Sequence, residues 1–183
     1  MGLRPMDYCW IATRKMELQK VLDALSLSET DARDDAMTAP FCAVELPSGV
    51  LVVQTSQEDE SFMDTETVEA LSEEGEAFLC MVSEDSMMAI LMYCRDGEAR
   101  WLVSHDGEQG PDHLEVEGDL PEIFGELRED LQDRASKDEE PVEFFTLPVE
   151  LALALTGYQG YGDVPGIVPG SVRVLSRRDP QPE

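Results

Sequence analysis

The sequence predicts an α+β fold, in which a mostly antiparallel sheet carries two main amphipathic helices plus short helices packed on it. β-rich runs follow one another with only short turns between them, so neighbouring strands should pair as hairpins. Helical patterns are few and are not interleaved regularly with the strands, unlike those of a parallel α/β sheet. The chain has 183 residues, of which 42% are apolar, which is enough to bury a core.

The first third of the chain predicts one helix and three strands. Residues 8–13 are almost entirely apolar and are expected to form a strand. Residues 15–27 predict a helix, because four apolar positions recur at helical spacing: Leu18, Val21, Leu22 and Leu25. Residues 28–38 are polar and acidic, so a loop is expected there. The turn residues Pro47-Ser48-Gly49 join two β-rich runs into a hairpin, and these runs cover residues 41–46 and 50–55.

The middle of the chain predicts a short helix and a three-stranded meander. The helix covers residues 64–71 and begins at Asp64, whose carboxylate complements the helix dipole. The strands cover residues 76–82, 87–94 and 98–104. The second of them is apolar on both faces and is expected at the centre of the sheet. Ile90 and Leu91 should then be buried on opposite faces, one of them beneath a helix over residues 120–136.

The last third predicts two helices and three strands. The helix over 120–136 has Pro121 in its first turn, and a shorter helix over 148–155 ends at Gly157. Strands are expected over residues 114–117, 142–146 and 172–175. We expect a single domain over residues 1–175, with two packed lobes (about 1–75 and 76–175) as the alternative arrangement. Residues 176–183 are expected to fray.

The charge limits the classes of partner. The chain has 13 Lys and Arg against 40 Asp and Glu, a formal net charge of −27. Nucleic acid and anionic membranes would be repelled, so neither is expected as a partner. No apolar signal core or membrane-length run is visible, and a cytoplasmic protein is expected. The four cysteines lie in apolar surroundings without a C-x-x-C pair, which predicts buried, reduced thiols.

The sequence contains no motif that is expected to be catalytic. Ser104-His105-Asp106 has the residue types of a hydrolase triad, but neighbouring residues on a strand point to opposite faces. The loop from His105 to His113 is rich in carboxylates and is a weaker candidate for a metal or ligand site. We therefore expect a protein that is not an enzyme and has no metal or cofactor.

The distribution of acids is the most informative feature. No Lys or Arg occurs between Arg33 and Arg95, a stretch that contains 14 acids. The sequence therefore predicts an unpaired, strongly negative surface. This surface favours a docking face for a cationic partner, with adaptation for solubility or high salt as the alternative. Two tyrosines of the Gly-rich segment after residue 156 are also predicted to anchor the interface with the partner. The predicted partner-binding residues are Glu58, Asp59, Glu60, Asp64, Glu66, Glu73, Glu74, Tyr158 and Tyr161.

Three runs of sequence resemble small bacterial proteins of the toxin-immunity type, and they cover residues 101–106, 114–124 and 142–152. The resemblance implies an α+β binding protein without a catalytic centre, and it assigns no binding residue. The first hypothesis is therefore an acidic protein that neutralises a basic protein, such as a nuclease-like toxin. The alternatives are a nucleic-acid mimic that inhibits a DNA-binding or restriction enzyme, and a small hydrolase or ligand-binding domain that uses the His105 loop.

Overall fold

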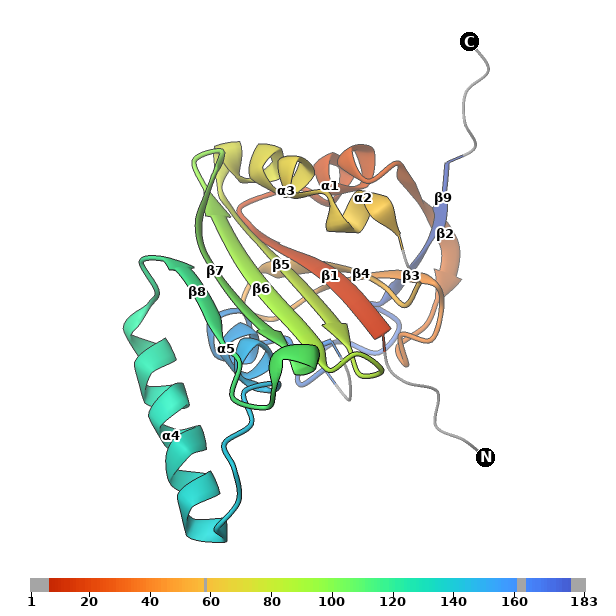
Figure 1. Cartoon of the computed structure of the whole chain (residues 1–183). Coiled ribbons are helices and arrows are strands. Elements are labelled where there is room, and N and C mark those ends of the chain that lie inside the picture. The colour runs from red at the N-terminus through yellow and green to blue at the C-terminus, as the bar shows by residue number, and fades with distance from the viewer. Residues whose placement is uncertain (1–6, 58, 161–163, 179–183) are drawn as a thin grey trace.

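A computed structural model describes residues 7–57, 59–160 and 164–178 of the chain. It has the predicted α+β architecture, a nine-stranded antiparallel sheet with helices packed on both faces (Figure 1). The strand order is β2-β9-β3-β4-β1-β5-β6-β7-β8. The strands are β1 (Asp7–Arg14), β2 (Leu27–Arg33), β3 (Phe41–Glu45), β4 (Val50–Thr55), β5 (Glu76–Ser83), β6 (Met88–Arg95), β7 (Glu98–Asp106), β8 (Glu115–Gly118) and β9 (Arg173–Arg177).

The helices form two groups, one on each face of the sheet. The first group is α1 (Leu18–Ala24), α2 (Glu60–Met63) and α3 (Thr65–Leu71), followed by a 3-10 turn over Ser72–Glu74. The second group is α4 (Glu122–Asp138) and α5 (Leu147–Thr156), and a further 3-10 turn covers Gly107–Gln109. Figure 1 shows α5 behind the sheet and α4 standing out beside it.

The sheet separates two apolar cores. On one face, Trp10 and Leu91 pack with Leu147 and Leu151 of α5. On the other face, Ile11 and Leu79 pack with side chains of the first helix group, namely Leu22, Phe62 and Val68. Trp10 and Ile11 are adjacent residues of β1, and both are fully buried. A strand buried on both faces belongs at the centre of a sheet, and β1 has four strands on either side.

The structure corrects four predicted elements. The predicted helix over 15–27 is shorter, and the predicted loop over 28–38 contains the edge strand β2. The predicted strand over 142–146 is a loop, held by a hydrogen bond from the Phe144 amide to the Pro111 carbonyl. The C-terminal strand β9 continues to Arg177, so the tail predicted from residue 176 begins inside a strand.

The predicted centre of the sheet is also wrong, because β1 and not the strand over 87–94 lies there. Leu91 is fully buried as predicted, but Ile90 on the opposite face is only partly buried. The core around Leu91 is covered chiefly by α5, whereas the predicted cover, α4, packs against α5. The sheet runs without interruption through both of the lobes that were considered as an alternative.

Candidate functional site

The acidic segment after β4 folds into two short helices, α2 and α3. An aspartate of the segment caps the N-terminus of each helix. The Asp59 carboxylate accepts hydrogen bonds from the amide and hydroxyl of Ser61, at 3.1 and 2.6 Å. The Asp64 carboxylate accepts from the amides of Glu66 and Thr67, each at 3.3 Å, and from the Thr67 hydroxyl at 2.5 Å. The bond from the Thr67 hydroxyl is the main reason that the pKa of Asp64 lies below its ordinary value. These caps stabilise the first turns of α2 and α3.

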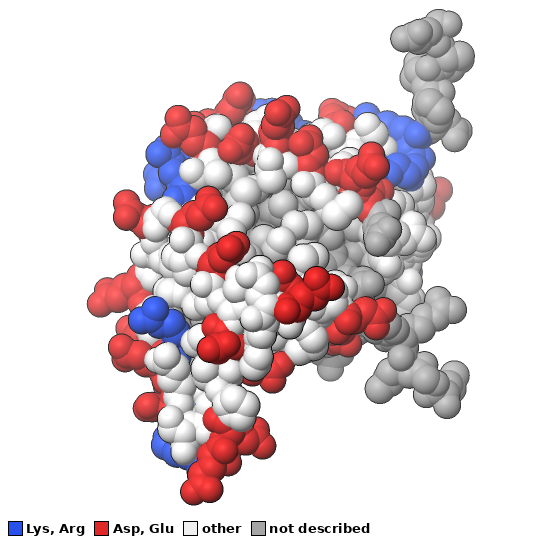
Figure 2. Space-filling model, viewed as in Figure 1, with Lys and Arg blue, Asp and Glu red and all other residues white. Residues whose placement is uncertain are grey.

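Five of the predicted partner-binding acids are exposed on this helical layer: Glu60, Asp64, Glu66, Glu73 and Glu74. Figure 2 shows acidic side chains across the same part of the molecule, with basic side chains toward its margins. Glu58 and Tyr161, which were also predicted to bind the partner, lie outside the described residues. We name the exposed set Glu60, Asp64, Glu66, Glu73 and Glu74 the acidic layer.

Two of the predicted acids are neutralised by bases from distant parts of the sequence. Asp59 forms an ion pair with Arg177 of β9, and only 11% of its side chain is exposed. Burial alone would raise the pKa of Asp59, but hydrogen bonds from Arg177 and Ser61 outweigh it and lower the pKa below its ordinary value. Glu74 forms an ion pair with Lys20 of α1. The prediction of an unpaired surface is therefore wrong at these two positions, and Asp59 has a structural role.

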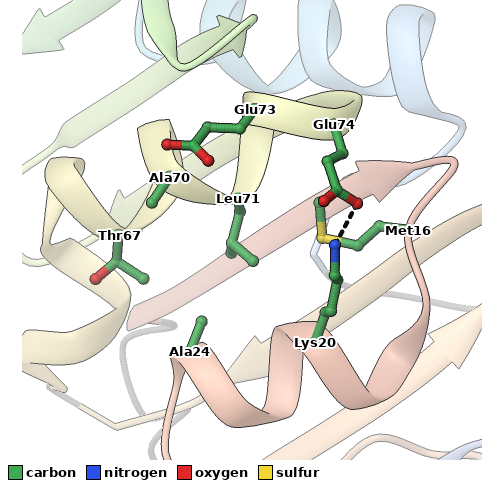
Figure 3. Close-up of a pocket in the computed structure, with 8 residues that line it drawn as sticks. All are labelled: Met16, Lys20, Ala24, Thr67, Ala70, Leu71, Glu73 and Glu74. Carbon is green, nitrogen blue, oxygen red and sulfur yellow. Dashed lines mark hydrogen bonds and ion pairs between the residues drawn. The ribbon is translucent and has the colours of Figure 1, made fainter.

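A groove of about 280 Å³ lies between α1 and α3 (Figure 3). Its apolar lining includes Met16 and Leu71. Figure 3 shows Glu74 reaching across the groove to Lys20, whereas Glu73 points away from that pair. The ion pair thus ties α3 to α1 at one end of the groove, and the Glu73 carboxylate stays available on the surface.

The helical layer leaves part of the sheet uncovered below α2. A second groove, of about 250 Å³, lies there, and its apolar lining includes Cys9 of β1 with Met63, Met81 and Met88. Met63 is 43% exposed and Met88 is 38% exposed. We call this feature the methionine groove. The sequence does not predict this groove, because a uniformly apolar strand indicates one that is covered on both faces. The signal for it is the unusual number of methionines in residues 81–92.

The His105 side chain is buried and is held by its own loop. The His105 ring is 1% exposed, bonds through Nδ1 to the His113 carbonyl at 2.8 Å, and packs against Phe145. Strand alternation directs it away from the face that carries Ser104, as predicted. Among the described residues, no group of three or more His, Cys, Asp or Glu side chains is placed to hold a metal ion.

Tyr158 is not an interface anchor, which corrects its assignment. Its side chain is only 4% exposed, packs edge-to-face on Trp10, and donates a hydrogen bond from its hydroxyl to Gln54 of β4. A buried tyrosine hydroxyl needs a hydrogen-bond partner, and the Gln54 side chain provides it. The Tyr158 ring itself is part of the core next to β4. The four cysteines are buried and unpaired, as expected.

The comparisons with known proteins identify no relative. No family model, no curated protein and no solved structure matches the chain. In the part of the chain that the structure describes, no helix has the length and apolar character needed to cross a bilayer.

Proposed function

We propose that this chain is a non-catalytic acidic protein that binds and neutralises a cationic protein, and in particular that it is a cytoplasmic immunity protein against a bacterial toxin. The observation that carries the proposal is the acidic layer. Within the described residues, Glu60, Glu66 and Glu73 have no Lys or Arg at ion-pair distance. Their charges add to one another on the capped helices α2 and α3 and on the turn after them.

A surface of this kind acts mainly on the rate of encounter. Like charges held together on one face attract an oppositely charged partner over about 10 Å at moderate salt. A toxin that cleaves nucleic acid needs a basic groove for phosphate, and an acidic protein seated there would exclude the substrate. Because Asp59 and Glu74 already have basic partners, the other acids are the ones available to the toxin.

Mimicry of nucleic acid has less support than docking to a compact basic surface. A mimic needs carboxylates spaced like phosphates along an elongated face. The longest helix, α4, has exposed acids, but its sequence alternates them with Arg128, Arg134 and Lys137. The mixed charges interrupt any continuous negative row on that helix.

The test begins with capture of the partner from the source organism and its identification by mass spectrometry. We expect a basic protein whose toxicity is abolished when this chain is co-expressed. The association rate is then measured with the triple variant Glu60→Gln, Glu66→Gln, Glu73→Gln. We expect it to fall about tenfold at low salt, with a weaker dependence on salt, because charge steering acts on the association rate.

The control removes the same number of charges from α4, with Glu126→Gln, Glu129→Gln and Asp133→Asn. All three positions are exposed. The control should bind at nearly the wild-type rate. Equal slowing by both triple variants would show that net charge alone matters, and would contradict the assignment of the acidic layer as the docking face.

A further inference from the structure

We infer that the methionine groove is a binding site for a cationic amphipathic helix of the partner, and that it holds the apolar face of that helix. This inference rests on the proposed function, because it names the chemistry of the segment that the acidic protein holds. The groove lining contains none of the carboxylates of the acidic layer, although Glu60 lies on the same helix as Met63.

The groove is built by side chains that strand register places on one face. Cys9 of β1 lies opposite Met81 of β5, which in turn lies opposite Ile90 of β6. Met88 lies two residues before Ile90 and therefore points to the same face. Met63 of α2 lines the groove from the helical layer. Methionine is unbranched and polarisable, so a methionine surface can adjust to differently shaped apolar side chains.

The surroundings of the groove carry negative charge. Asp106 of β7 lies directly opposite Met88, and Glu115 of β8 lies opposite Ser104, the neighbour of Ile90 across the strands. Glu60 is exposed on α2, the helix that carries Met63. Among the described residues, the lining contains no Lys or Arg, and its one carboxylate, Asp59, is largely buried and paired with Arg177. Figure 2 shows the result, an uncharged hollow in the middle of this face with acidic side chains around it.

An apolar floor with an acidic rim matches an amphipathic helix that has basic residues beside its apolar stripe. The same charge argues against the other occupants. A second copy would carry the same net charge of −27 to the interface, and an anionic lipid surface would be repelled. A cationic amphipathic helix can bury its apolar side chains on the floor of the groove and pair its basic side chains with the acids of the rim.

The test uses two fluorescent model peptides of about 18 residues, or five helical turns. Both contain the same leucines and lysines. One arranges the leucines along a single helical face, and the other distributes them around the helix. We expect the first peptide to bind the full chain about tenfold more tightly, because only it can place several apolar side chains in the groove together.

The variant is Met63→Ser with Met88→Ser, and the control is Val116→Ser with Leu153→Ser. The control pair has similar exposure but lies elsewhere, Val116 on the opposite face of the sheet and Leu153 on α5. The methionine variant should lose most of the preference for the amphipathic peptide, and the control should keep it. Urea unfolding of each variant verifies that it folds.

A second measurement uses the wild-type chain. Met63 and Met88 should be oxidised by peroxide much faster than buried Met92, and the amphipathic peptide should protect them. If both methionines are already as protected as Met92 in the free chain, another part of the chain or a second copy occupies the groove, and the inference is overturned.

The failures of the two proposals are distinguishable. Equal binding of the two peptides, with no effect of the methionine variant, overturns the groove inference and leaves docking through the acidic layer standing. Failure of both peptides to bind even at low salt contradicts both proposals.

Discussion

Replacing Leu91 and Ile90 separately by alanine measures how differently the two faces of β6 are covered. The residues are neighbours in one strand and lose the same number of carbon atoms on truncation. Leu91 is fully buried between Cys80 and Val103 in the core beneath α5. Ile90 lies opposite Met81, on the face of the sheet that carries the methionine groove, and is only partly buried.

The expected costs differ because only one truncation leaves an enclosed void. Leu91→Ala removes three buried carbons, about 2.4 kcal/mol at roughly 0.8 kcal/mol for each. The enclosed cavity adds to this, which brings the total to about 3.5 kcal/mol. Ile90→Ala loses a smaller transfer free energy, and the vacated space opens to water, so we expect about 1.5 kcal/mol.

Urea unfolding provides the assay. With a slope of roughly 2 kcal/mol per molar urea, the midpoints should fall by about 1.7 M for Leu91→Ala and about 0.8 M for Ile90→Ala. Ile90→Thr is the control, because it keeps the β-branch that favours strands and adds a hydroxyl that water can reach only if the face is open. If Ile90→Ala costs as much as Leu91→Ala, or Ile90→Thr costs more than either, the face of β6 beside the groove is closed in solution and the reasoning is refuted.

Two further predictions concern titratable groups. Burial raises the pKa of Cys9 and Cys94 to about 12, so thiol labelling of the native protein at neutral pH should be slow and should reach four groups only after denaturation; rapid labelling would contradict the buried assignment. The pKa of Asp59 is lowered, so its stabilising effect is present above the ordinary value of 3.8 and is lost as the pH falls through the lower native pKa. The stability difference between wild type and Asp59→Asn should therefore shrink on acidification below 3.8, and a constant difference would show that Asp59 is not held as a carboxylate by Arg177.

The sequence predicts elements that are stabilised by their own neighbours. The β5-β6-β7 meander is joined by short turns, and strand patterns with turn residues identified all three strands. The edge strand β2 was missed because only its first residue is buried, so its sequence shows no apolar alternation. Its pairing comes from β9, which no local pattern can reveal.

The candidate site, too, can be predicted from the sequence only where it depends on neighbouring residues. Local composition predicts the exposure of five of the acids, Glu60, Asp64, Glu66, Glu73 and Glu74, and all five are exposed. It gave no indication that Arg177 would reach Asp59 or that Lys20 would reach Glu74, because these pairs form only when distant segments meet on the sheet. Tyr158 was assigned to the surface because it follows a helix-ending glycine in a Gly-rich run, whereas its ring closes the core behind β4. The methionine groove depends on where the helical layer stops, which is a tertiary property.

The position of β9 between β2 and β3 sets an order on the assembly of the sheet. The hydroxyl of Thr30 in β2 donates to the carbonyl of Val174 in β9 across 144 residues of sequence, and among the described strands only β9 pairs with β2. A growing chain must therefore hold β2 without a partner until β9 has been made. The same strand brings Arg177 to the aspartate that begins α2. The aspartate cap of α2 thus gains its basic partner only after every other strand of the described sheet has been synthesised, which couples the packing of this helix to completion of the sheet.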